Sequence, residues 1–170
     1  MNEAKKFQQF NNLYGLTRKQ LTHEKALNTA KLIMQEVVEF VEEFYEMSAI
    51  ETDMVGGIDF VLGNKIEKPN LNNAFKELED VRYITGQQMT ELGGDVSAIG
   101  DEVHRSNMSK SISASDVVRE IEIARARYPS AIDTTQDCEV FVLKCSETGK
   151  VIKPTIYSAA VITDAMIGKN

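Results

Sequence analysis

The sequence predicts a mainly α protein, a helical bundle followed by a small C-terminal β-hairpin. Apolar residues recur at spacings of three and four over residues 22–48, and a second helical pattern runs over 72–92. Such spacing is typical of helices that bury one face. Near the C-terminus the pattern changes, because β-branched and aromatic residues flank a Gly-containing turn over residues 139–157. This change predicts a hairpin.

Composition limits the organisation and the partners of the chain. Its 170 residues, 42% of them hydrophobic, are enough for one domain with its own core. We therefore expect residues 1–170 to form a single domain, with a helical core over about 1–110 and a helix-plus-hairpin extension over about 111–170. A net charge of −7 argues against binding to polymeric nucleic acid. The sequence has neither a signal-peptide run nor a membrane-spanning run, which predicts a cytoplasmic protein without a membrane partner.

The N-terminal half is expected to contain two helices and a connection. Residues 3–13 suggest a short helix that ends before Gly15. The long helix over 22–48 follows. Residues 49–71 contain several Gly and Asn residues and one Pro, so they are expected to form a connection, with at most a brief helical turn in the IDFVLG stretch.

Two more helices and the hairpin are expected after the helix over 72–92, which two glycines end. The next helix is expected to start at the N-cap Asp95 and run to about Lys110, and a fourth is expected between a serine cap near residue 113 and Pro129. EVFVLKC and KVIKPTIY, joined by SETG, are the expected strands, and Pro154 restricts the second one to an edge. Cys138 and Cys145 lie seven residues apart and are expected to be ordinary reduced thiols.

Two pairs of acidic residues carry the functional interpretation. Glu36 and Glu39 lie three residues apart in one predicted helix, and Glu77 and Asp80 do the same in another. Residues three apart on a helix share a face, so each pair can point at one place. The second pair falls on the apolar side of its helix, with Ala74. Because an unpartnered buried carboxylate is costly, these acids require a salt bridge, a proton or a metal ion.

Carboxylate oxygens without thiolates or a nearby histidine pair favour magnesium or manganese over zinc. A magnesium ion shared with phosphates suits hydrolysis of a phosphoanhydride. Three alternatives stay open: a solvated acidic surface or buried ion pairs, a non-catalytic helical module that binds a basic partner through its acidic face, and a di-iron protein. The chain has no Glu-x-x-His motif, so the di-iron interpretation has little support.

The segment HRSNMSK, residues 104–110, lies near the end of a predicted helix. His104, Asn107 and Lys110 share one helix face and can form a donor-rich edge for phosphates. A polar helix end, with Asn107 as a cap and Lys110 near the C-terminal dipole, explains them as well. Four aromatic residues suit either stacking on a base or core packing: Phe7, Phe10, Tyr14 and Tyr83.

The order of these motifs resembles the MazG-like, all-α nucleoside triphosphate pyrophosphohydrolases, and more narrowly the phosphoribosyl-ATP pyrophosphohydrolase-like branch. The resemblance rests on EVVE at 36–39, on ELED at 77–80 leading into VRYITGQ, and on EVHRSNMSK at 102–110. The opening FQQFNNLYGL and the later GKVIKPTIYSAA are similar to the same branch. The resemblance implies a helical bundle of the all-α NTP pyrophosphatase type. The long connection at 49–71 and the insertion before GKVIKP depart from the compact pattern.

The resemblance also implies the chemistry. Four acids would bind Mg²⁺, with Mn²⁺ as a substitute: Glu36, Glu39, Glu77 and Asp80. Three residues would contact the nucleotide phosphates: Arg105, Asn107 and Lys110. A metal-activated water would cleave a nucleoside triphosphate to monophosphate and pyrophosphate, as in housekeeping of the nucleotide pool, and Glu36 or Glu39, at the border of the site, would position that water. Family members assemble from paired helices, which implies a homodimer or homotetramer.

Overall fold

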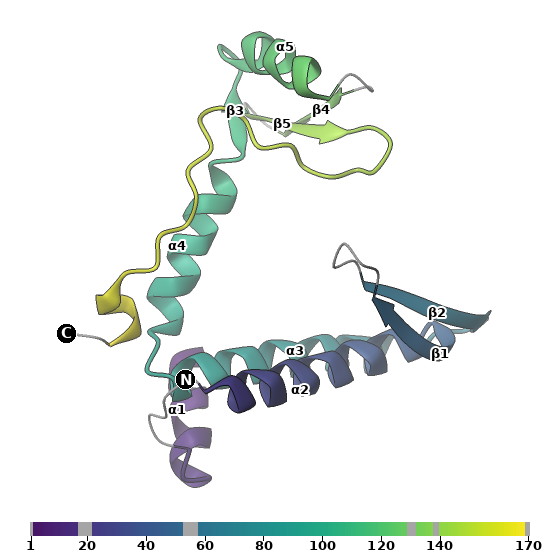
Figure 1. Ribbon diagram of the computed structural model, residues 1–170, viewed down its shortest axis with the longest axis vertical. Helices are drawn as coiled ribbons and strands as arrows, with labels where there is room; N and C mark the ends of the chain where they lie inside the picture. Colours follow the sequence, from purple (N-terminus) through teal and green to yellow (C-terminus); the bar gives the residue numbers. More distant parts are fainter. Residues whose placement is uncertain (1, 17–21, 53–57, 129–131, 138–139, 169–170) are drawn as a thin grey trace. The chain divides into compact units, whose positions relative to one another are not determined.

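The computed structural model describes residues 2–16, 22–52, 58–128, 132–137 and 140–168 (Figure 1). Its described part contains five α-helices and two small antiparallel sheets, so the predicted mainly α class with a minor β component is confirmed. The chain divides into two compact units, residues 1–96 and 97–170. No helix in the described ranges combines the length and the apolar character that a bilayer crossing requires.

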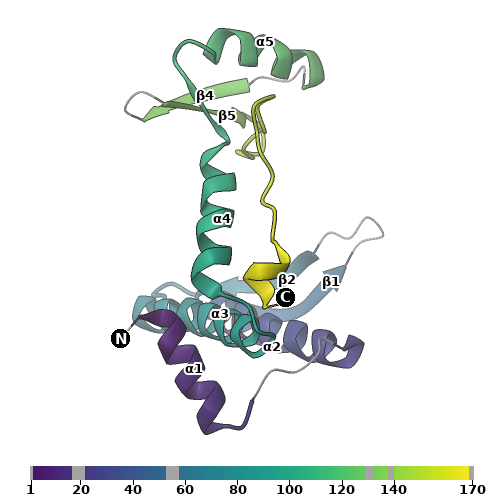
Figure 2. The same cartoon turned by 90° about the vertical axis from the view of Figure 1, so that its left-hand side faces the viewer.

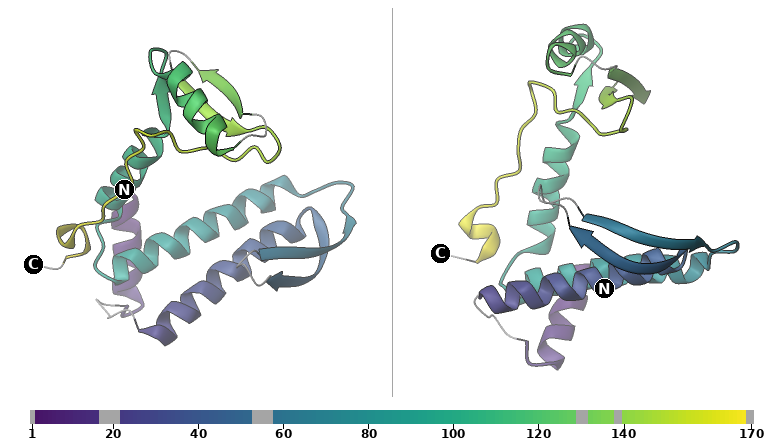
Figure 3. Two further views of the ribbon diagram at one scale, coloured as in Figure 1. Left: turned by 45° about the horizontal axis from the view of Figure 1, so that its top comes forward. Right: turned by 45° about the vertical axis from the view of Figure 1, so that its right-hand side comes forward.

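The first unit contains α1 (Glu3–Leu13), α2 (His23–Glu42) and α3 (Leu71–Glu91). Helices α2 and α3 run antiparallel and side by side, and α1 crosses against α3 (Figure 3). Each helix begins where a polar side chain accepts a hydrogen bond from the first turn. Asn2 accepts from the Lys5 N–H at 3.0 Å, Thr22 from Lys25 at 3.1 Å and Asn70 from Asn73 at 3.2 Å. These caps fix the starts of the three helices.

Helix α1 is held by one large ring and by a polar network. The Phe7 ring is 2% exposed and lies against Gly86, which leaves room for it because it has no side chain. Beside it, the Gln87 amide donates to Asn11 Oδ1 at 2.8 Å, and both side chains are buried. Phe7 and Phe10 also meet Tyr83 edge to face, with ring centroids 5.2 and 5.5 Å apart. Of the four aromatic candidates, Phe7 therefore serves the core.

A β-hairpin joins α2 to α3, where a longer helix and an irregular connection were expected. That prediction was wrong: α2 ends at Glu42, and β1 (Tyr45–Thr52) pairs antiparallel with β2 (Ile58–Lys65). Gly63 lets the two strands approach closely, since a Cβ there would lie 2.9 Å from the Glu46 carbonyl oxygen. The Asn64 amide donates to the Glu46 carboxylate at 2.9 Å. The strand pairing satisfies the backbone N–H and C=O groups that helical hydrogen bonds would otherwise have satisfied.

The second unit combines α4 with a helix packed on a three-stranded sheet in the order β3-β5-β4. Its elements are α4 (Val96–Met108), β3 (Ser111–Ser113), α5 (Val117–Arg127), β4 (Ile132–Asp137), β5 (Val140–Cys145) and the 3₁₀-helix η1 (Asp164–Ile167). Its core consists of Ile112, Ala124, Leu143 and Ile152. Contacts group α4 with this unit, whereas the sequence pattern grouped it with the first three helices. That residues 1–170 form a single domain stays a prediction.

Strand β5 forms as predicted, but its main partners differ from the expected hairpin. It pairs with β3 and β4, and the stretch 150–157 contributes only a single bridge between Lys144 and Val151. Pro154 has no N–H for a ladder, and the Thr155 N–H donates instead to the Glu120 carboxylate at 2.7 Å. The chain therefore leaves the sheet there. Cys145 is a free thiol, and Cys138 lies outside the described residues.

The C-terminal segment then runs along α4 (Figure 2). The Val161 N–H donates to the Glu102 carboxylate at 2.8 Å, and the Ser158 N–H donates to Ser109 Oγ at 3.0 Å. Arg105 donates to the Ala159 carbonyl oxygen at 3.0 Å. Polar side chains of α4 thus hold an extended segment that has few apolar contacts of its own.

Candidate metal centre

Helices α2 and α3 bring the predicted acidic pairs together. One carboxylate oxygen from each of Glu36, Glu39 and Glu77 lies within 4.8 Å of the other two. Asp80 adds to this group, since its charge is among those that raise the pKa of Glu36. The pairs lie side by side because α2 and α3 pack antiparallel, so one turn of each helix faces the other. We call these four residues the acidic cluster.

Burial differs among the four side chains. Glu77 is only 4% exposed and lies on the face of α3 that also buries Ala74. Glu36 is half-buried, Glu39 is exposed and the Asp80 side chain is 40% exposed. The cluster is therefore closed at Glu77 and open to solvent at Glu39. The prediction of acids on an apolar helix face fits Glu77 best.

The negative charges of the acidic cluster favour the binding of a cation. Partial burial, followed by the charges of Glu39, Asp80 and Glu77, raises the pKa of Glu36 above its ordinary value of 4.5. A carboxylate with a raised pKa is one whose negative charge is poorly compensated. Four carboxylates gathered in this way carry more negative charge than the nearby side chains neutralise.

One lysine partly relieves this repulsion. The Lys76 ammonium lies 2.8 Å from Glu77 Oε2 and 2.9 Å from Asp80 Oδ2. Hydrogen bonds to these two carboxylates raise the pKa of Lys76, so it stays charged. Sequence reasoning missed Lys76, although its spacing of four from Asp80 is a helix ion-pair signal.

The donor set fits a hard divalent cation. All ligand atoms in the cluster are carboxylate oxygens, with no imidazole or thiolate among them. Magnesium and manganese prefer such oxygens, and magnesium in particular uses few protein ligands and shares its remaining positions with water and phosphate. Partly open access at Glu39 and Asp80 agrees with a site that a phosphate must reach.

The three predicted phosphate contacts belong to the second unit. The Arg105 guanidinium pairs with Glu102 at 2.8 Å and also holds the C-terminal segment. Arg105 lowers the pKa of Glu102 to about 2, so this ion pair persists at neutral pH. Lys110 donates to Asn107 Oδ1 at 2.7 Å, so these two side chains are neighbours at the end of α4, as predicted. Arg105 therefore contacts Glu102 and Ala159, and the phosphate contacts of all three residues stay a prediction.

A groove of about 940 Å³ runs between the three helices of the first unit. Leu32 and Ile84 line it, one turn along their helices from Glu36 and Asp80. Aromatic and amide side chains share its walls: Phe10, Tyr83, Asn28, Gln87 and Gln88. Phe10 and Tyr83 were predicted candidates, whereas the amides were missed because single amides on helices carry no sequence signal. Tyr14 stacks on Phe10 instead, with ring centroids 4.5 Å apart.

Comparison of the chain with family models, with curated proteins and with solved structures gave no match.

Proposed function

We propose that this protein is a magnesium-dependent nucleotide pyrophosphohydrolase of the MazG-like, all-α type. The reaction is hydrolysis of a nucleoside triphosphate, or a related nucleotide, to a monophosphate and pyrophosphate, in housekeeping of the nucleotide pool. The observation that supports it is the convergence of Glu36, Glu39 and Glu77 within 4.8 Å, with Asp80 beside them and Glu77 buried. A buried carboxylate in a group of like charges is expected where a cation completes the site.

The acidic cluster has the properties that this reaction needs. Mg²⁺, when bound, neutralises phosphate charge and lowers the pKa of a coordinated water. Glu77 and Asp80 would supply ligands from α3, and Glu36 and Glu39 from α2. Glu36, half-buried at the border of the cluster, would accept a proton from the attacking water. Glu39, exposed at the rim, would orient that water.

Lys76 acts in this scheme as an internal counter-ion. Its ammonium contacts Glu77 and Asp80, the same carboxylates that a metal ion would use. Its side chain is largely exposed and has freedom to move. Cation binding would therefore release Lys76 from Glu77 and Asp80 and leave its charge available for a phosphate group.

The groove along α1, α2 and α3 supports a nucleotide as the substrate. It lies one helical turn from the acidic cluster, so a base in the groove would leave the phosphates near the acids. The Tyr83 ring offers a surface for stacking, and the exposed Asn28 amide can pair with the edge of a base. By resemblance to the family, Asn107 and Lys110, which are neighbours at the end of α4, are proposed to contact the phosphates.

We also propose that the protein works as a homodimer or homotetramer. Helix α2 has an apolar periodicity, yet none of its residues with a described side chain is buried. Large apolar side chains on α3 are exposed as well, among them Leu71, Phe75 and Leu78. A second α2–α3 pair would cover such faces, as in other paired-helix assemblies.

The direct test is product analysis. The full chain would be incubated with Mg²⁺ and a broad panel of ribonucleotides, deoxynucleotides and modified nucleotides, and the products resolved by phosphorus NMR. We expect pyrophosphate and monophosphate from at least one nucleotide, and no turnover with EDTA. Glu39→Gln should abolish turnover, whereas Glu42→Gln, on the exposed face one turn further along α2, should retain it.

If no nucleotide in the panel released pyrophosphate, the proposed pyrophosphohydrolase activity would be excluded. A non-catalytic module that binds a basic partner through its acidic face is the alternative. The exposed acids Glu39 and Glu42 favour it, but Glu77 does not, because an interaction surface has no need of a buried carboxylate. Such a surface would lose little affinity when Glu39 alone is neutralised.

A further inference from the structure

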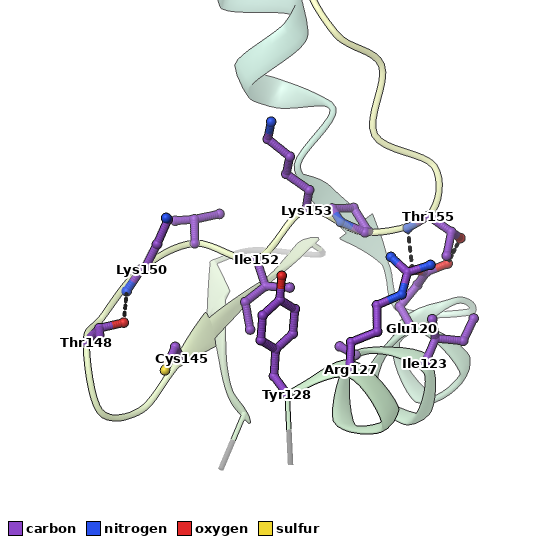
Figure 4. Close-up of a pocket in the computed structure, with 13 residues that line it drawn as sticks. Glu120, Ile123, Arg127, Tyr128, Cys145, Thr148, Lys150, Ile152, Lys153 and Thr155 are labelled. Carbon is purple, nitrogen blue, oxygen red and sulfur yellow. Dashed lines mark hydrogen bonds between the residues drawn. The ribbon is translucent and has the colours of Figure 1, made fainter. Parts of the chain in front are cut away.

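The second unit contains a cavity of its own, of about 500 Å³, between α5 and the segment that follows β5 (Figure 4). This volume is in the range of small-molecule sites. Residues near the C-terminal end of α5 form one wall, and residues 145–155 form the other. It lies entirely within the second unit, and the acidic cluster takes no part in it.

Hydrogen bonds hold both walls in place without a ligand. Glu120, a fully buried carboxylate on α5, accepts hydrogen bonds from the Thr155 N–H at 2.7 Å and from the Thr155 hydroxyl. On the other side, the Ile152 N–H donates to the Leu143 carbonyl oxygen at 2.8 Å and the Cys145 N–H to that of Lys150 at 2.9 Å. The cavity is therefore preformed, which reduces the entropic cost of binding.

The charged side chains of the cavity are mostly basic. Arg127, Lys150 and Lys153 line it, and Glu120 is the acid among the lining residues. Both Glu120 oxygens already accept hydrogen bonds from Thr155, and Arg119 adds a contact at 3.2 Å. Within the described part of the chain, the Arg127 guanidinium and the Lys150 ammonium form no ion pair. The Arg127 guanidinium therefore offers this cavity a positive charge for an anion.

Aromatic and aliphatic side chains complete the cavity. Figure 4 shows Tyr128 and Arg127 rising from the end of α5, with the Tyr128 ring directed toward Ile152 and the Arg127 guanidinium toward Thr155. Lys153 points away from Tyr128 and instead lies over the Tyr157 ring, 4.5 Å from its centroid. A ring beside an unpaired guanidinium matches a ligand with a flat apolar body and one anionic group.

We propose that this cavity binds a small aromatic anion, with its ring against Tyr128 and Ile152 and its phosphate or carboxylate neutralised by Arg127. The site is independent of the proposed hydrolase reaction and would remain if that reaction were absent.

The test uses the full chain in EDTA, so that the acidic cluster cannot recruit a ligand through a metal ion. Phenyl phosphate and benzoate are the two aromatic anions. Benzamide is the control that has the ring without the charge, and inorganic phosphate is the control that has the charge without the ring. Binding is measured by ligand-observed NMR and calorimetry. We expect at least one aromatic anion to bind about tenfold more tightly than benzamide and inorganic phosphate. Which of the two binds identifies the anionic group as phosphate or carboxylate.

Variants locate the binding. Arg127→Gln should weaken it about tenfold, as expected for loss of a charge-assisted hydrogen bond, and Tyr128→Leu should weaken it as well. Arg125→Gln is the matched control, because Arg125 lies on the same helix, is exposed and does not line the cavity. The proposal is overturned if neither aromatic anion binds, if benzamide or inorganic phosphate binds as tightly, or if Arg127→Gln and Arg125→Gln behave alike.

Discussion

At the scale of single residues, the acidic cluster depends on how four like charges are compensated. Lys76 contacts Glu77 and Asp80 at 2.8 and 2.9 Å, whereas Glu36 shares the cluster with a raised pKa. A metal ion at this position competes with the Lys76 ammonium for Glu77 and Asp80, and with a proton for Glu36. Changes at Lys76 and at Glu36 therefore separate the effect of charge on metal affinity from its effect on stability.

The variant Lys76→Gln is expected to bind divalent metal several-fold more tightly than the wild type. It removes the internal ammonium that a metal ion must displace, and it leaves the carboxylates in place. Isothermal titration with Mn²⁺ measures the change. Lys68→Gln removes the same charge from the loop before α3, so it accounts for the change in net charge. Equal affinities for Lys76→Gln and Lys68→Gln would contradict the role given to Lys76.

The variant Glu36→Gln is expected to make the metal-free protein more stable at neutral pH. Because the folded-state pKa of Glu36 is raised, the folded protein holds this proton more tightly than the unfolded chain does. Its contribution to stability is therefore present at low pH and is lost as the pH rises through the folded-state pKa.

Thermal unfolding in EDTA at pH 4 and pH 7 checks this sign. The gain from Glu36→Gln should appear at pH 7 and shrink toward pH 4, and Glu42→Gln should show no such trend. If Glu36→Gln lowered the melting temperature at pH 7, the repulsion inferred for the acidic cluster would be absent.

Among the helices and strands, the helices were largely predictable, whereas of the strands β5 alone was predicted. Local signals fixed the helices: the caps Asn2, Thr22 and Asn70 and the apolar spacing each act within one or two turns. Strand β4 was missed because its sequence, IDTTQD, is mostly polar and lacks the apolar alternation of a strand, although it pairs with β5 directly after it. The apolar spacing of α2 also continued into β1, which concealed the end of the helix.

The candidate site was predictable for the same reason. Spacing of three within α2 and within α3 placed each acidic pair on one face, and the packing of two long helices brought the pairs together. The cavity beside Tyr128 depends on contacts between α5 and residues 145–155, which periodicity does not reveal, whereas Lys76 carried a helix ion-pair spacing that was missed.

The contact between α1 and α3 allows a sharp test with two glycines. A Cβ at Gly86 would lie 2.4 Å from Phe7 ring atoms, whereas a Cβ at Gly100 in α4 meets nothing within 4 Å. Gly86→Ala should therefore lower the free energy of unfolding by about 1–3 kcal/mol through overpacking. Gly100→Ala should raise it by roughly 0.5–1 kcal/mol through helix propensity. Urea unfolding compares them, and a neutral Gly86→Ala would disprove the packing of Phe7 on α3.

At the scale of the whole molecule, the first unit leaves apolar surface uncovered. Phe75 on α3 is 72% exposed, and Leu71 and Leu78 lie on the same helix. Surfaces of this kind usually mark interfaces. A self-assembled protein would bury them, and it would place two or more acidic clusters in one particle.

The mass in solution should therefore be a multiple of 19.0 kDa. Phe75→Glu should reduce it to that of the monomer, because a charge on this face opposes burial. Val118→Glu, an equivalent change at an exposed apolar residue of α5, should leave the mass unchanged. Light scattering after size-exclusion chromatography measures the masses of the wild type and of both variants. A monomeric wild type would contradict the proposed assembly.

A Mn²⁺ titration followed by electron paramagnetic resonance tests whether the acidic cluster binds a metal ion. We expect saturable binding by the wild type, binding weaker by about tenfold or more in Glu39→Gln and Glu77→Gln, and unchanged binding in Glu42→Gln. Circular dichroism would confirm that each variant is folded. If the wild type bound no Mn²⁺, or if all three variants bound it as tightly as the wild type, the acidic cluster would not be a metal centre.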